Sequence, residues 1–174
     1  EMMGAMPMEM NMRVAIPFVL GATFAIMPIT AVSISMEGKE AWILKSLPLS
    51  RKEILDGKIL FQLGLMAPFY VVAVILSSMA LQLSILEIIG MVVVPAILIL
   101  FSAVFGIFVN LWLPKMQWDS EVAVVKQSAS AVIGGLVPAL VSGICAIVVM
   151  VIPQIYTGIG YVAISLVLVA VTGV

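Results

Sequence analysis

Long stretches without a single charged residue constrain this chain more than any other feature. They cover residues 14–36, 59–81, 88–113, 128–152 and 159–174. A helix needs about 20 predominantly apolar residues to cross the hydrocarbon core of a bilayer. Four of the stretches meet that length, and the last one starts a fifth span. The sequence therefore predicts an all-α fold, a polytopic helical membrane protein with about five transmembrane helices.

The composition agrees with a membrane protein. The chain is 64% hydrophobic and 10% charged, whereas a soluble domain is about 45–50% apolar and about 25% charged. We therefore expect the lipid bilayer to be its environment. The net charge of −1 suggests no nucleic-acid partner. His is absent and Cys145 is the only Cys, which excludes a disulfide framework and a zinc site of His and Cys ligands.

The first residues of the chain and the prolines of the first stretch predict further local structure. The chain starts with Glu1 and ends inside an apolar stretch, so we expect a single transmembrane domain, 1–174, from a longer protein. Residues 1–13 are predicted to be irregular or to end an earlier element. Pro17 and Pro28 lie inside the first stretch and predict a kink or an interruption there.

The basic residues predict the orientation of the spans. Successive spans alternate in direction, so the polar intervals 37–58 and 114–127 must share one side. Lys and Arg in short loops mark the cytoplasmic side. The two intervals hold Lys39, Lys45, Arg51, Lys52, Lys58, Lys115 and Lys126. The other side holds only Arg13, so we expect both polar loops to be cytoplasmic. The N-terminal segment and the short turns at 82–87 and 153–158 would lie outside.

Residues 39–47, in the first polar loop, have the spacing of a short amphipathic helix. Ile43, Leu44 and Leu47 fall on one face, and Trp42 flanks that face. Such a helix is expected to lie at the membrane surface, with the indole at headgroup depth. The pattern alone fits either an interaction surface or a turn that only fixes topology.

The second half of the first loop predicts another helix start. Pro48 should end the short helix, because the residue before a proline is pushed out of the α region. Ser50 and Glu53 then have the spacing of a capping box. The helix that they start would continue through Lys58 into the second span.

The two polar loops resemble those of type-2 ATP-binding cassette exporter permeases. In the first loop the matching residues are Glu37, Gly38, Leu44, Leu47, Pro48, Ser50, Arg51, Gly57 and Lys58. The resemblance is closer to a bacterial subgroup of long permeases with a Lys-Ser-Leu-Pro core in this loop. The second loop of that subgroup is matched by Pro114, Lys115, Trp118, Glu121, Val125, Lys126, Gln127 and Ser128. These motifs cover about a fifth of the chain and occur in the family's order. By this resemblance the chain would correspond to the second to sixth spans of a six-span unit, the C-terminal unit of a long permease. It would lack a complete first and last span of that unit.

The resemblance implies a function and its partners. A coupling helix at about 39–47 would dock in a groove of a separate ATP-binding cassette ATPase subunit. The chain itself would lie in the plasma membrane. The residues implied in coupling are Glu37, Lys39, Trp42, Leu44, Lys45, Leu47 and Pro48. The partner subunit would bind ATP and magnesium, and another permease half or subunit would complete the path. The chain itself would have no catalytic residue, cofactor or metal. Replacing Leu44 and Leu47 with Asp should then abolish ATPase stimulation while the protein still inserts.

Further residues of the second loop suggest a helix start. Trp118 suits an interfacial anchor, and Asp119 or Ser120 suits a helix N-cap. Glu121 would then lie in the first turn, where the helix dipole favours a carboxylate. A contact of Trp118, Glu121 and Lys126 with the ATPase subunit is the functional alternative.

Small and polar residues within the spans give expectations about packing. Ala131, Gly135, Ala139 and Gly143 recur every four residues and predict a close helix contact. Gln62, Asn110 and Gln127 are the polar candidates near span ends. We expect Asn110 to be a helix-end residue at the interface. The alternatives are that it bonds across helices or faces a cavity.

Two other functions stay open. No P-loop motif occurs, so any ATP-driven function requires a partner. All nine acidic residues fall in predicted loops or at span ends. A charge in mid-bilayer would signal an ion path, and its absence argues against an ion-coupled secondary transporter. A non-transporting scaffold or sensor is the other alternative, and nothing in the sequence selects a substrate.

Overall fold

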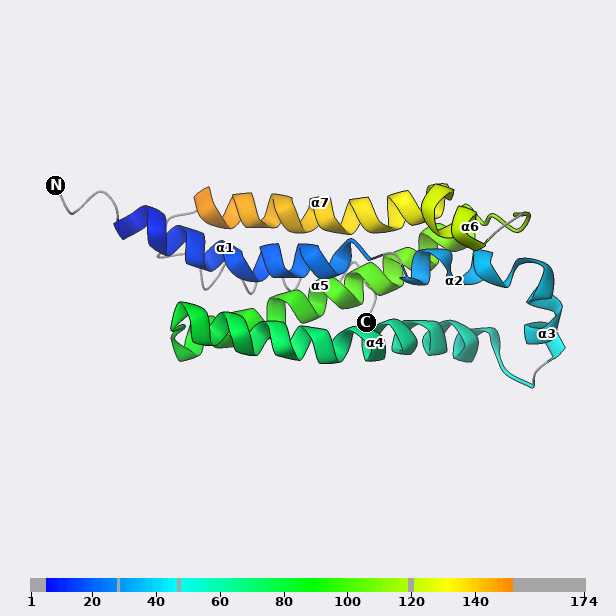
Figure 1. The fold of residues 1–174 in the computed structure, drawn as a ribbon, viewed down its shortest axis with the longest axis horizontal. Helices are drawn as coiled ribbons and strands as arrows, with labels where there is room; N and C mark the ends of the chain where they lie inside the picture. Colours follow the sequence, from blue (N-terminus) through cyan, green and yellow to red (C-terminus); the bar gives the residue numbers. More distant parts are fainter. Residues whose placement is uncertain (1–5, 28, 47, 119–120, 152–174) are drawn as a thin grey trace.

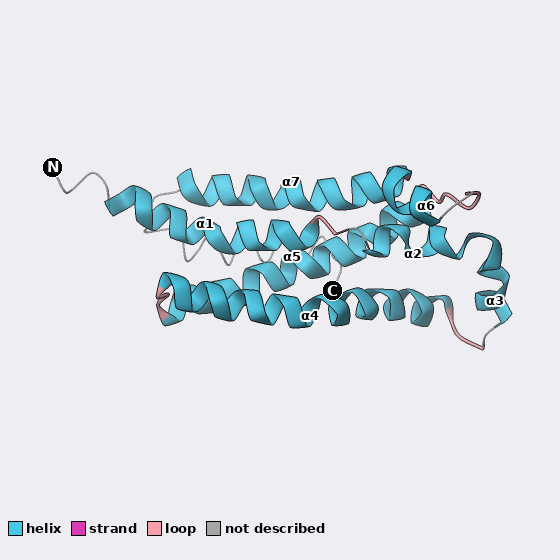
Figure 2. Ribbon diagram, viewed as in Figure 1, coloured by secondary structure: helices cyan, strands magenta, loops and turns pink. Residues whose placement is uncertain are grey.

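The computed structural model describes residues 6–27, 29–46, 48–118 and 121–151. Across these residues the fold is all-helical and contains no strand (Figures 1 and 2). The elements in order are α1 (Met6–Ala25), α2 (Ile29–Glu37), the 3-10 helix η1 (Gly38–Glu40), α3 (Ala41–Ser46), α4 (Arg51–Leu81), α5 (Ile85–Trp112), α6 (Glu121–Gln127) and α7 (Ala129–Val151). The predicted fold class is confirmed.

Four of these segments are long and apolar enough to cross a membrane. They are Arg13–Glu37, Arg51–Leu81, Ile85–Trp112 and Ala129–Met150. Each exceeds the roughly 20 residues that a bilayer requires. The protein is therefore a multi-pass helical membrane protein. The predicted fifth span, 159–174, and the turn before it lie outside the described residues.

The first span is interrupted in its middle. α1 continues through Pro17 but ends at Ala25, and α2 starts at Ile29, just after Pro28. A proline has no N–H and clashes with the preceding turn, which explains why the interruption lies here. The predicted interruption is therefore confirmed at Pro28. At Pro17 the helix is not interrupted, and the kink predicted there stays a prediction. Residues 6–13 are helical, so the prediction of irregular structure was wrong for them.

α4 and α5 form an antiparallel hairpin whose helices both begin with capping boxes. Ser50 caps α4 through Glu53, as predicted, and Ser84 caps α5 through Glu87. The second box was missed, because the predicted turn ran to residue 87. The turn is instead closed by Gln82, whose φ of 49° lies in the left-handed region.

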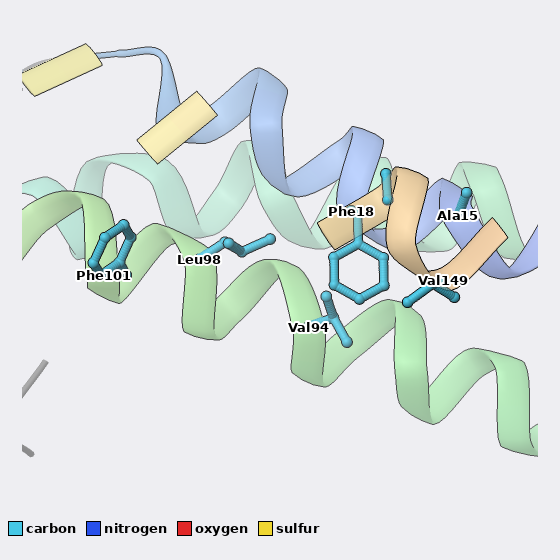
Figure 3. Close-up of a cluster of buried hydrophobic side chains, with 7 residues drawn as sticks. Ala15, Phe18, Val94, Leu98, Phe101 and Val149 are labelled. Atoms are coloured by element: carbon cyan, nitrogen blue, oxygen red, sulfur yellow. The ribbon is translucent and has the colours of Figure 1, made fainter. Parts of the chain in front are cut away.

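The core lies where α1, α5 and α7 pack together. Phe18 of α1 is fully buried and points between Val94 and Leu98 of α5 and Val149 of α7 (Figure 3). Large side chains from three helices thus fill one cluster, which holds the N-terminal half of the interrupted span in place. α4 has fewer contacts and packs mainly against α5.

The two polar loops gather at one end of the bundle. α3 and α6 lie at the same end, and the turn between α4 and α5 lies at the opposite end (Figure 1). This arrangement follows from the alternation of the spans and agrees with the predicted grouping of the basic residues. We call this end of the molecule the loop end.

Candidate coupling site

The predicted coupling helix is present as two short elements. Gly38–Glu40 forms a 3-10 turn that starts one residue before the predicted range 39–47. Ala41–Ser46 forms α3 and lies within that range. Trp42 is 67% exposed and Ile43 is 43% exposed, so two adjacent apolar side chains face outward at the loop end. Pro48 is exposed beyond α3. Leu47 and the side chains of Lys39, Leu44 and Lys45 lie outside the described residues.

An ion pair closes the base of this loop. The Lys58 ammonium, on α4, pairs with the Glu37 carboxylate at the end of α2. It also donates a hydrogen bond to the Ser33 carbonyl at 3.4 Å. Glu37 and Lys58 were each identified from the loop motif, but the sequence did not predict that they pair. The pair joins the two helices that enter and leave the loop.

A buried amide fastens α2 to α5 and α7. Asn110 is fully buried, and its Oδ1 accepts hydrogen bonds from the N–H groups of Ile34 and Ser35 at 2.8 and 3.1 Å. Its Nδ2 donates to the hydroxyls of Ser35 and Ser130 at 2.6 and 3.1 Å. The expectation that Asn110 is an interfacial helix-end residue was therefore wrong, and its alternative, a bond across helices, is confirmed. We call Ser35, Asn110 and Ser130 the asparagine cluster.

The second loop covers the same end of α2. The indole N–H of Trp118 donates to the Ser35 carbonyl at 3.0 Å, and the Lys115 N–H donates to the Ser35 hydroxyl at 3.0 Å. A Cβ at Gly38 would lie 2.8 Å from the Trp118 Nε1, and Gly38 has a φ of +33°. Only glycine fits that backbone and that contact readily. Trp118 thus holds the start of the first-loop segment Gly38–Ser46. The predicted role of Trp118 as an interfacial anchor did not anticipate this contact.

α6, which ends the second loop, packs against α2 and α7. Val124 is fully buried and packs with Val32 of α2 and Ala131 of α7. Ser128 caps α7 by accepting a hydrogen bond from the Ala131 N–H at 3.1 Å. The proposed N-cap residues Asp119 and Ser120 and the side chains of Glu121 and Lys126 lie outside the described residues.

Side chains of neighbouring helices form hydrogen bonds with backbone groups at the interruption of the first span. Gln62 of α4 accepts a hydrogen bond from the Thr30 N–H at 2.9 Å, and the Ser102 hydroxyl donates to the Ala25 carbonyl at 2.9 Å. Backbone groups freed by a helix break need such partners inside a membrane. Gln62 is fully buried, and its Nε2 is the one buried side-chain N or O atom without a hydrogen-bond partner in the described part of the chain. The sequence placed Gln62 near a span end and missed this function.

A close contact between α7 and α2 lies at Gly134, one residue from the predicted stripe. A Cβ at Gly134 would lie 2.3 Å from the Ala31 Cβ, and one at Gly106 would lie 2.4 Å from the Thr30 Oγ1. α2, α5 and α7 therefore meet at Gly106 and Gly134. Of the predicted stripe, Ala131 and Gly135 are buried and Ala139 is half-buried. No described atom lies within 4 Å of a Cβ at Gly143, so the predicted close contact is wrong there.

No protein-family model, curated protein or solved structure matches this chain. The resemblance to exporter permeases therefore rests on the residues of the two polar loops.

Proposed function

We propose that this chain belongs to the transmembrane permease subunit of an ATP-binding cassette exporter. A separate ATPase subunit would bind and hydrolyse ATP with magnesium, and the chain would couple that hydrolysis to export. The single observation that carries the proposal is the pair of loop motifs, which match such permeases in content and order. The chain would lie in the plasma membrane with both polar loops in the cytoplasm.

The geometry of the first loop is what a coupling element requires. Trp42 and Ile43 are exposed on a short helix at the loop end, and exposed apolar side chains rimmed by charge are typical of interaction sites. The base of this helix is held by the Glu37–Lys58 ion pair, by Trp118 and by the asparagine cluster. A displacement of α3 by the ATPase subunit would therefore move the ends of α2 and α4 and would not be absorbed by a flexible loop.

The proposal is tested by replacing the exposed apolar pair. The double variant Trp42→Asp/Ile43→Asp should abolish stimulation of the co-expressed ATPase subunit, because a docking surface that loses its apolar contacts binds poorly. The Leu44→Asp/Leu47→Asp variant should do the same. The matched control is Ile85→Asp/Leu86→Asp, whose side chains are 81% and 75% exposed at the opposite end. All three should insert in the membrane. Full ATPase stimulation by both loop variants would refute the coupling role.

An ion-coupled secondary transporter is the second candidate function. The interrupted first span favours it, since broken helices in transporters often form substrate and ion sites near the bilayer midplane. The described acidic residues argue against it, because Glu53 and Glu87 lie in first turns and Glu37 at a helix end. Transport by proteoliposomes that contain no ATPase would favour this candidate over the exporter.

A further inference from the structure

An open groove of about 700 Å³ separates α2 from the first turns of α4. On α2 it is lined by residues spaced three and four apart, from Ile29 to Glu37, which form one helix face. On α4 it is lined from Glu53 to Phe61, and Leu49 and Val125 complete it. Eight residues of helix rise by about 12 Å, so the groove runs from the loop end into one half of the first and second spans.

Charge in this groove is confined to one end, and Ser33 is the one polar side chain among the described lining residues between the two ends. Glu37, Glu53 and Lys58 lie at the loop end, whereas Ile29 and Phe61 lie at the inner end. The wall between them is almost entirely apolar. In a bilayer the polar end lies toward the headgroups and the apolar end toward the acyl chains. An occupant must therefore present one polar end and one apolar end to the groove. The groove volume of about 700 Å³ lies within the range of about 300–1,000 Å³ typical of ligand sites.

The charges at the polar end carry both signs. Two carboxylates, Glu37 and Glu53, face the groove with one ammonium, Lys58. The exposed side chains of Arg51, Lys52 and Asp56 surround them on α4. Lys58 is paired with Glu37, and the exposed Glu53 carboxylate accepts a hydrogen bond from the Ser50 N–H. A purely anionic headgroup would meet two carboxylates, whereas a zwitterionic one can lie beside the Glu37–Lys58 pair with its ammonium toward Glu53.

A glycine keeps the groove wide. Gly57 lines it, and no described atom lies within 4 Å of a Cβ at this position. Glycine inside a helix costs about 0.5–1 kcal/mol relative to alanine, and no close helix contact explains its presence here. A larger side chain at this position would project into the groove at the level between its polar and apolar ends.

From the shape, the polarity gradient and the mixed charges, we propose that this groove binds a zwitterionic phospholipid. One acyl chain would lie along α2 and α4, and the headgroup would lie at Glu37, Glu53 and Lys58. The proposal does not depend on the exporter function, because it concerns the leaflet at the loop end whichever partner acts there.

The test uses the purified chain in phosphatidylglycerol vesicles that contain a small fraction of phosphatidylethanolamine with a photoactivatable acyl chain. Labelled peptides are mapped by mass spectrometry. In the unaltered protein we expect labels on α2 and α4 around the groove. Gly57→Leu should lower this labelling about tenfold, the effect of losing roughly two buried methylene contacts. Gly57→Ala should lower it less, which preserves the test if the leucine variant does not fold.

Gly64→Leu is the matched control. Gly64 lies on the same helix in open space, but it does not line the groove. Labelling in this variant should stay unchanged. Equal labelling of the Gly57→Leu and Gly64→Leu variants would overturn the site.

Two further measurements test the occupant. Unlabelled phosphatidylethanolamine should compete with the probe better than phosphatidylglycerol, and equal competition would overturn the choice of headgroup. In a Cys145→Ala background, Met36→Cys should not crosslink to a second polypeptide. An efficient crosslink between copies with no lipid labelling would show that protein, and not lipid, fills the groove.

Discussion

Helices α5 and α4 run side by side yet are held very differently. In their most apolar segments, 56% of α5 is buried inside the molecule, compared with 17% of α4. Glycines of α5 and α7 touch α2 directly, whereas Gly57 and Gly64 of α4 lie in open space. α2 is also bound to α5 and α7 by the asparagine cluster. The first-loop segment Gly38–Ser46 thus joins a tightly packed helix, α2, to a loosely packed one, α4. Under the coupling proposal, we expect force on this segment to move α4 more easily than α2.

The largest expected effect is at the crossing of α2 and α5. Gly106→Val would place its Cβ 2.4 Å from the Thr30 Oγ1 and 2.9 Å from the backbone N of Ala31. Overpacking of this kind costs about 1–3 kcal/mol and sometimes more, and backbone atoms of α2 cannot move aside easily. Denaturation in mixed detergent micelles should show the loss. Gly64→Val is the control on α4, and an equal loss there would remove the contrast between the two helices.

The next effect should come from the asparagine cluster. Asn110→Leu keeps the approximate size of the side chain but leaves the Ile34 and Ser35 N–H groups without their acceptor. A buried polar group without a partner costs about 1–3 kcal/mol. The same micelle denaturation measures it, with the exposed Gln127→Leu as the control. Unchanged stability would mean that the cluster does not fasten α2.

A smaller effect is expected at the second loop. Trp118→Phe keeps an aromatic ring but removes the N–H that bonds to the Ser35 carbonyl. Loss of one such hydrogen bond costs about 0.5–1.5 kcal/mol. Hydrogen exchange of the Gly38–Ser46 amides should become faster. Trp112→Phe, with a side chain 73% exposed, should leave that exchange unaltered. Equal protection in both variants would contradict a role for Trp118 in holding the loop.

The smallest effect should have the opposite sign. Gly64 lies in open space on α4, so the methyl group that Gly64→Ala adds has no described atom within 4 Å. Alanine is favoured over glycine inside a helix by about 0.5–1 kcal/mol. Micelle denaturation should therefore show a small gain in stability. A loss would reveal a contact of α4 that the loose packing does not suggest.

Hydropathy and local signals were enough to predict the long helices of the bundle, but not the first turns of α1, residues 6–13. A charge-free stretch of some 20 residues has one stable form in a bilayer, and the break before Pro28 and the Ser50 capping box depend on neighbouring residues alone. The asparagine cluster could not be predicted, because Ser35 and Asn110 are 75 positions apart and a polar residue near a span end usually reaches water. The close contact of Gly134 with Ala31 depends on how α2 crosses α7, which no spacing on one helix reveals.

The most direct test of the coupling proposal is to find what touches α3 in the cell. A photo-crosslinking amino acid at position 42, whose Trp is 67% exposed at the loop end, would capture the neighbour for mass spectrometry. We predict a crosslink to a cytoplasmic subunit with ATP-binding cassette motifs. This crosslink should be absent when the crosslinking amino acid is at position 86. A Cys at position 42 that reacts with a membrane-impermeant maleimide from outside intact cells would contradict it.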